Sequence, residues 1–145
     1  MKKTQLLILG FIVLILSLIW EFSHFPLYYP LIGISKTPLL LIAGIGDLFL
    51  ISLIFLAISY KNKTTNWIKT PDYSDYLLII LLGSFISILI EVISLNLGSW
   101  AYREAMPVIL GIGLSPLVQL SVTSILSLFI LRKISPSKSL FSKNL

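Results

Sequence analysis

The sequence predicts an all-α fold: a polytopic membrane protein built as a four-transmembrane-helix bundle. Three observations lead to this prediction. The chain of 145 residues is 57% hydrophobic, with a mean hydropathy of +0.99. Only 12% of its residues are charged, about half of the share of about 25% that is usual in soluble domains. Its apolar residues also fall in four stretches, each long enough to cross about 30 Å of hydrocarbon as a helix of roughly 20 residues.

Each of the four stretches ends at a polar or proline-containing segment. We expect membrane spans at about residues 5–22, 38–60, 76–97 and 106–131, within a single membrane domain that covers residues 1–145. The first span follows Lys2 and Lys3, and no small-residue cleavage site comes after it, so it predicts an uncleaved helix rather than a signal peptide. The fourth span contains Gly111, Gly113 and Pro116, and we expect a kink there.

Lysine and arginine are distributed unevenly over the connecting segments. With this topology, nine of the 11 basic residues lie on the side of the two termini and of segment 61–75, and Lys36 and Arg103 lie on the other side. Positively charged loops stay in the cytoplasm. The distribution therefore predicts a multi-pass plasma-membrane protein with cytoplasmic N- and C-termini. Because topology accounts for the basic residues, the net charge of +5 does not predict a nucleic-acid partner.

Polar side chains recur at membrane depth in all four spans. They follow helical spacing, for example Ser87, Glu91 and Ser94 in the third span and Ser115, Gln119 and Thr123 in the fourth. Lipid cannot satisfy such groups, so we expect them to face one another and to form a polar cavity in the outer half of the membrane. The candidate residues are Glu91, Asp47, Glu21 and His24 for catalysis, and Trp100, Tyr102, Arg103 and Gln119 for substrate binding.

The acidic residues of these spans leave several kinds of chemistry open. Carboxylates at membrane depth serve as proton donors and acceptors, or they form an interior network, such as Glu91 with Arg103, that fixes helix packing. Glu21 and His24 have the Glu-x-x-His spacing of metal ligands on a helix, but a two-metal bundle shows this pair twice and the chain shows it once. We predict no metal and no cofactor. The chain has no cysteine, so it has no thiolate nucleophile or ligand.

Several short motifs occur in a characteristic order: Trp20-Glu21, Pro26-Leu27-Tyr28, Gly46-Asp47, Trp100-x-Tyr102, and Gly113-Leu114-Ser115-Pro116-Leu117-x-Gln119. In this order the chain resembles a family of small four-span prokaryotic membrane proteins that has no assigned function. The resemblance covers most of residues 19–120. It implies a four-span fold and no particular activity.

A second, fainter resemblance starts from Glu91, Gly98 and the turn of Trp100 and Tyr102. A membrane glutamate followed by such a turn is similar to heterodimer-type lycopene cyclases and carotenoid hydratases. The cyclases carry paired glutamates after a later proline, whereas this chain continues from Pro116 with leucine, valine and glutamine. The resemblance implies that the cavity accepts an apolar lipid or isoprenoid chain.

Together these features predict a membrane protein that binds or modifies a lipid or isoprenoid. In this hypothesis Glu91 and Asp47 give and take a proton, and Arg103 sets their charge state. Two alternatives stay open: a small proton- or ion-coupled transporter subunit, and a non-catalytic assembly or scaffold protein. A transporter with four helices per chain needs more than one copy, so a homo-oligomer is also open.

Overall fold

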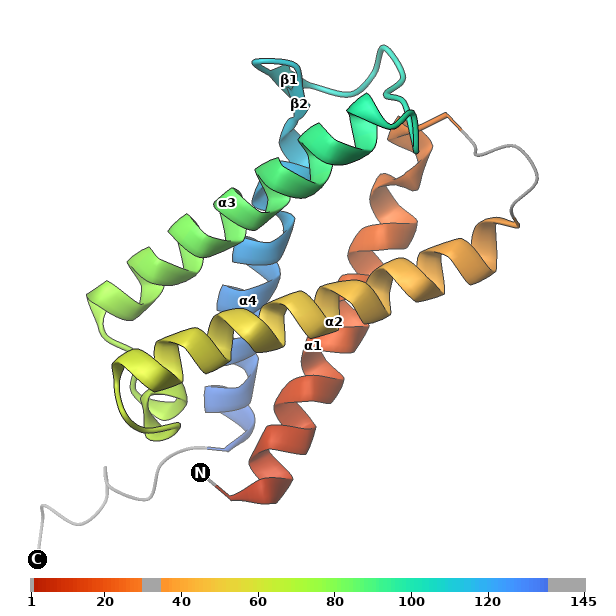
Figure 1. The fold of residues 1–145 in the computed structure, drawn as a ribbon. Helices are drawn as coiled ribbons and strands as arrows, with labels where there is room; N and C mark the ends of the chain where they lie inside the picture. Colours follow the sequence, from red (N-terminus) through yellow and green to blue (C-terminus); the bar gives the residue numbers. More distant parts are fainter. Residues whose placement is uncertain (1, 30–34, 136–145) are drawn as a thin grey trace, which may run out of the picture.

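The computed structural model, which describes residues 2–29 and 35–135, is an all-α bundle of four long helices (Figure 1). They are α1 (Lys3–His24), α2 (Lys36–Lys61), α3 (Tyr73–Asn96) and α4 (Leu114–Ile134). Short 3₁₀ helices follow α1 (η1, Phe25–Leu27) and α2 (η2, Asn66–Lys69). All four long helices have the length and apolar composition of membrane spans. The chain is thus a multi-pass membrane protein, as its sequence predicts.

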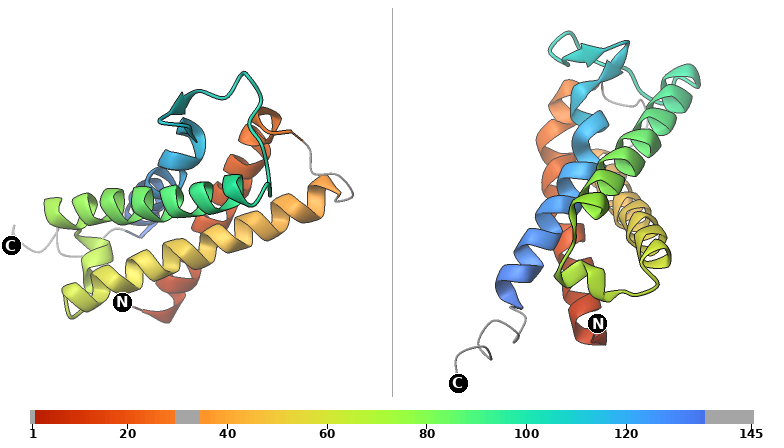
Figure 2. Two further views of the ribbon diagram at one scale, coloured as in Figure 1. Left: turned by 45° about the horizontal axis from the view of Figure 1, so that its top comes forward. Right: turned by 90° about the vertical axis from the view of Figure 1, so that its left-hand side faces the viewer.

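Helix α4 is the central element of the bundle. It packs against α3 on one side and α1 on the other, and α2 packs mainly against α1 (Figure 2). Within its most apolar stretch 50% of the residues are buried, against 22 to 28% in the other three helices. Serine side chains let α3 and α4 approach closely: a Cβ atom at Gly83 of α3 would lie 2.5 Å from the Ser121 Oγ of α4.

The fourth helix begins later than the sequence predicts. It starts at Leu114 rather than near residue 106, because the preceding residues fold into a small antiparallel hairpin of β1 (Val108–Ile109) and β2 (Ile112–Gly113). The hairpin turns at Leu110 and Gly111, whose φ angles are 53° and 83°. Pro116 lies in the first turn of α4, where backbone N–H groups have no acceptor within the helix, so the N–H that proline lacks is not needed. The expected kink of the fourth span is therefore replaced by a hairpin and a helix start.

The two ends of the bundle differ in their packing. At one end α1 begins, α4 ends, and residues 62–72 connect α2 to α3; we call it the terminal end. A buried apolar core, which includes Leu9, Ile54, Ile58, Trp67 and Leu128, fills this half. At the other end, which we call the hairpin end, α2 and α3 have diverged from each other (Figure 1).

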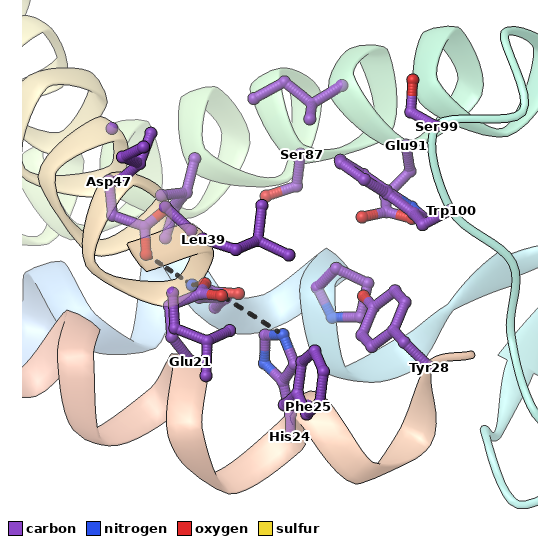
Figure 3. Close-up of a pocket in the computed structure, with 18 of the residues that line it drawn as sticks. Glu21, His24, Phe25, Tyr28, Leu39, Asp47, Ser87, Glu91, Ser99 and Trp100 are labelled. Atoms are coloured by element: carbon purple, nitrogen blue, oxygen red, sulfur yellow. Dashed lines mark hydrogen bonds and ion pairs between the residues drawn. The ribbon is translucent and has the colours of Figure 1, made fainter. Parts of the chain in front are cut away.

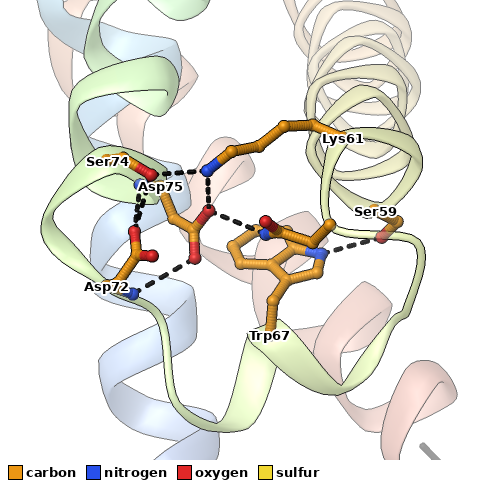
Figure 4. A network of polar contacts seen from close by, with 7 residues as sticks. Ser59, Lys61, Trp67, Asp72, Ser74 and Asp75 are labelled. Carbon is orange, nitrogen blue, oxygen red and sulfur yellow. Dashed lines mark hydrogen bonds and ion pairs between the residues drawn. The ribbon is translucent and has the colours of Figure 1, made fainter.

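A polar cluster closes the terminal end (Figure 4). The carboxylate of Asp75, which is 2% exposed, accepts hydrogen bonds from Lys61 Nζ at 3.1 Å and from Asn62 Nδ2 at 2.7 Å. It also accepts one from the Asp72 backbone N–H, while the Asp72 side chain caps α3 by accepting from the Asp75 N–H. The exposed carboxylate of Asp72 also accepts a hydrogen bond from the Ser74 side chain. This bond is the main cause that holds the pKa of Asp72 below its ordinary value. The indole of Trp67 donates to Ser59 beside the cluster.

At the hairpin end, the residues after α1 pair with the residues after α3. Tyr28 and Tyr102 form an antiparallel β-bridge. The Tyr29 N–H donates to the Ala101 carbonyl at 3.0 Å, and the Arg103 N–H donates to the Leu27 carbonyl at 2.9 Å. These bonds hold residues 100–103 in an extended form across the mouth of the bundle.

Candidate functional site

The hairpin end contains a cavity of about 480 Å³ between the four helices (Figure 3). Its walls are mostly apolar and come from every helix, for example Leu39 of α2, Ile90 of α3 and Leu120 of α4. Three carboxylates from three different helices also line it: Glu21, Asp47 and Glu91. This volume falls within the range of about 300–1,000 Å³ that small-molecule sites occupy.

Glu21 and Asp47 are joined by the amide of Gln119. The Gln119 Nε2 donates to Glu21 Oε1 at 2.6 Å and to Asp47 Oδ2 at 2.5 Å. Because one nitrogen binds both carboxyl groups, their oxygens lie close together. Two carboxylates this close to each other do not readily ionise at the same time. The three side chains come from α1, α2 and α4, so the cluster ties these helices together.

His24 lies next to this cluster, one turn after Glu21 on α1. Its Nε2 lies 3.8 Å from Glu21 Oε2, and its buried Nδ1 has no hydrogen-bond partner in the part of the chain that the structure describes. Within residues 2–29 and 35–135, no group of three or more His, Cys, Asp and Glu side chains has the geometry of a metal site. His24 thus leaves one ring nitrogen open to a further hydrogen bond beside Glu21.

Glu91 occupies the other side of the cavity (Figure 3). Its side chain is held by two donors from the segment after α3: Trp100 Nε1 donates to Oε2 at 3.1 Å, and the Tyr102 hydroxyl donates to the same oxygen. An extended segment points alternate side chains to the same side. The spacing of Trp100 and Tyr102 thus lets one short segment supply both bonds to this buried glutamate.

Tyr102 connects Glu91 to the hairpin. Its hydroxyl oxygen accepts a hydrogen bond from the Gly113 N–H at 3.0 Å while the hydroxyl donates to Glu91. Burial raises the pKa of Tyr102 far above its ordinary value, and the bond to Glu91 raises it further. Burial also raises the pKa of Tyr28, with the neighbouring Glu91 as the next cause. Both phenols therefore stay protonated and serve Glu91 and the cavity as neutral groups.

Arg103 does not lie where the sequence analysis expects it. It is exposed and does not line the cavity; its Nε donates to the Tyr28 carbonyl at 3.0 Å, and its guanidinium lies 5.5 Å from the centre of the Tyr29 ring. The reason is the same alternation along the extended segment: since Tyr102 faces Glu91, the next side chain points away. The expected pairing of Glu91 with Arg103 is therefore replaced by bonds to two neutral donors.

The structure brings together most of the residues that the sequence singles out. One cavity is lined by Glu21, His24, Asp47, Glu91, Trp100 and Gln119. Tyr102 does not line it but donates a hydrogen bond to Glu91. Sequence reasoning did not identify the apolar wall, which includes Leu39, Ala43, Leu50 and Ile90. These residues resemble any lipid-facing position in sequence. For the three residues of α2, a spacing of three, four or eight residues from Asp47 is the signal that marks them.

Comparisons of the chain with models of protein families, with curated proteins and with solved structures give no match. The geometry of the cavity therefore carries the functional argument.

Proposed function

We propose that this membrane protein binds a lipid or isoprenoid in the cavity and acts on it through proton transfer by the carboxylates. The observation that supports this function is the arrangement of three acids around one apolar chamber. On one side Gln119 joins Glu21 and Asp47, and on the other side Glu91 has no cationic partner among the described residues. A network that served packing alone would not need a chamber of about 480 Å³ between its members.

The division of roles follows from the contacts. The pair of Glu21 and Asp47 supplies or receives the proton, with Gln119 fixing both side chains in place. Glu91 is the second acid or base, and Trp100 and Tyr102 position its carboxylate. Enzymes that use two carboxylates need them in different environments, so that one gives a proton while the other takes it. In this protein Asp47 lies beside a second acid, Glu21, whereas Glu91 contacts only neutral donors.

The test is purification in a mild detergent, followed by mass spectrometry of the small molecules that copurify. The wild-type protein should retain a lipid or isoprenoid, and incubation with the extracted lipid should convert it. Glu91→Gln and Asp47→Asn should each abolish conversion, because both replacements keep the shape of the side chain and remove its acid.

Glu104→Gln is the matched control, since Glu104 is exposed in the same outer segment as Trp100 and Tyr102. It should convert the lipid as the wild type does. Conversion that persists in both Glu91→Gln and Asp47→Asn would refute the proposal. A protein without any copurifying lipid, whose variants differ from wild type only in stability, would favour a scaffold instead.

We also propose that the hairpin end faces the outside of the plasma membrane, as the distribution of lysine and arginine predicts. The chain has no cysteine, so single cysteines report topology without background. A membrane-impermeant maleimide should label Ser99→Cys in intact cells and should label Ser74→Cys after lysis only. The reverse pattern would place the cavity mouth in the cytoplasm. Crosslinking through the same cysteines would show whether the protein is a homo-oligomer.

A further inference from the structure

The charges around the cavity have one sign. Three of its lining residues are acidic, and among the described lining residues the single basic side chain is His24, which already lies near Glu21. No lysine or arginine of the described chain lines the cavity. Such a chamber repels a phosphate or carboxylate head group and attracts a positive one.

Two cationic side chains near the mouth of the cavity, Lys36 and Arg103, each contact an aromatic ring. Lys36 Nζ is 4.8 Å from the centre of the Phe25 ring, and the Arg103 guanidinium is 5.5 Å from the centre of the Tyr29 ring. Each cation thus lies against an aromatic ring that belongs to the cavity lining. The rings of Phe25 and Tyr29 thus each already have a cation of the protein beside them. No lysine or arginine of the described chain lies over the rings of Tyr28 and Trp100, which also line the cavity.

Tyr28 and Trp100 form an aromatic corner of the lining, which we call the cage. Their ring centres are 6.3 Å apart and the rings meet edge to face, at 89°. The electron-rich face of an aromatic ring attracts cations. The same corner holds Glu91, which receives a hydrogen bond from Trp100.

Glu91 itself lacks a counter-charge. It is 4% exposed, and its two hydrogen-bond donors both bind Oε2. None of the hydrogen bonds found among the described residues reaches its Oε1. A buried carboxylate without a cation is costly, and a ligand that brings the cation removes this cost.

We propose that the cavity takes an amphiphile whose head group is an ammonium, with the head between Tyr28, Trp100 and Glu91 and the alkyl chain along the wall of Leu39, Ile90 and Leu120. This inference rests on the proposed function, because it assigns the ligand class of the same cavity. The wall and the cage together match the two parts of such a molecule: an apolar chain and a compact positive charge. The pair of Glu21 and Asp47 lies on the opposite side of the cavity (Figure 3).

The test compares three ligands with the same ten-carbon chain: decyltrimethylammonium, decyl phosphate and decanol. Binding to the purified protein in maltoside micelles is followed by isothermal titration calorimetry. Decyltrimethylammonium should bind at least about tenfold more tightly than either of the other two, since the Glu91 carboxylate and the faces of the aromatic rings attract its positive head group. Equal or tighter binding of the phosphate would overturn the proposal.

The variants identify the residues responsible. Glu91→Gln should weaken ammonium binding about tenfold or more, and Glu104→Gln should leave it unchanged. Tyr28→Leu keeps all three acids and removes one ring of the cage, and should weaken binding about threefold to tenfold. This second variant decides the question if Glu91→Gln does not fold. Unchanged affinity in a folded Glu91→Gln or Tyr28→Leu protein would contradict the assigned site.

The two proposals fail in different ways. Tight ammonium binding that depends on Glu91, without conversion of any lipid, would retain the ligand class and refute the chemistry. Conversion of a neutral lipid, without any preference for the ammonium ligand, would retain the chemistry and refute the ligand class.

Discussion

Two clusters of acidic side chains lie at opposite ends of the same helices, and they are built differently. At the terminal end Asp75 meets a lysine, an asparagine and a backbone N–H, in a region filled by the apolar core. At the hairpin end Glu21, Asp47 and Glu91 meet an amide, an indole and a phenol around a cavity. Among the described residues, Asp75 pairs with a lysine, whereas the three acids of the hairpin end line the cavity without one.

This difference separates a structural role from a functional one. Asp75 has a cation and several donors, so nothing remains for a ligand to supply. The cavity acids accept hydrogen bonds from neutral donors, and none of the described residues donates to the second carboxylate oxygen of Glu91. Buried polar groups that the fold itself does not satisfy are the ones that a ligand or a proton satisfies. The comparison therefore predicts that variants at the terminal end affect stability and variants at the hairpin end affect activity.

The largest loss of stability should come from Asp75→Ala. It removes the acceptor of the bonds from Lys61, Asn62 and the Asp72 N–H, and it opens space inside a packed region. We expect the free energy of unfolding, measured in mild detergent, to fall by about 3 kcal/mol, since each bond to a charged group contributes about 1.5–3 kcal/mol and such losses do not add fully. Ligand binding by the protein that remains folded should be unchanged. An Asp75→Ala protein that is as stable as wild type but no longer binds the ligand would contradict the assignment of a structural role to the terminal end.

A somewhat smaller loss should come from Gly83→Ala, midway along α3 between the two clusters. The new Cβ would lie 3.0 Å from the Ser121 backbone nitrogen, so α3 and α4 must move apart. Overpacking of this kind costs about 1–3 kcal/mol. The variant should also weaken ligand binding, because α3 carries Glu91 and α4 carries Gln119.

Gly10→Ala is the control for this substitution. A Cβ at Gly10 would have no atom within 4 Å beyond its own helix, and alanine favours a helix over glycine by about 1 kcal/mol. It should leave stability unchanged or raise it slightly. If both alanine variants behaved alike, the close contact of α3 with α4 would not limit the stability of the bundle.

The sequence predicts the bundle well because its signals are local. Four long apolar stretches and their polar stripes define the helices and the faces they bury, and Ser17, Glu21, Ser87 and Glu91 are all buried. The contact of Glu21 with Asp47 through Gln119 joins three helices, and no local pattern specifies which of several polar side chains will meet. The hairpin before α4 was missed for a related reason: its residues are apolar enough to continue a span.

The position of Arg103 shows how a local rule could have improved the prediction. Charge alone predicts that the nearest cation pairs with the buried Glu91, and this prediction is wrong. The spacing of Trp100, Tyr102 and Arg103 in an extended segment determines the outcome, because the first two share a side and the third does not. Recognising that residues 100–103 are extended requires the pairing with residues 27–29, which lie far away in sequence.

A smaller effect, which depends on pH, should come from Tyr102→Phe. At pH 8 the variant should be less stable by about 1 kcal/mol, because Glu91 and the Gly113 N–H lose a hydrogen-bond partner. The pKa of Tyr102 is raised in the folded protein above its ordinary value of 10.0. As the pH rises above 10.0, the unfolded side chain ionises and the folded one does not, so the stabilisation by Tyr102 decreases. The difference in melting temperature between wild type and variant should therefore shrink above this pH. A difference that grew would show that folded Tyr102 is ionised.

The smallest effect on stability should come from Asp47→Asn, although this variant should lose activity entirely. The new amide keeps an oxygen for the bond from Gln119, so this link between α2 and α4 persists while the acid is lost. Asp47 is half-buried, and a neutral amide avoids the cost of removing a charge from water, so we expect the free energy of unfolding to change by less than about 1 kcal/mol. The same measurement on Asp75→Asn is the counterpart, since that change removes the charge that pairs with Lys61. If Asp47→Asn were the less stable of the two, the carboxylate of Asp47 would serve the fold as Asp75 does, and the functional reading of the cavity would lose its main support.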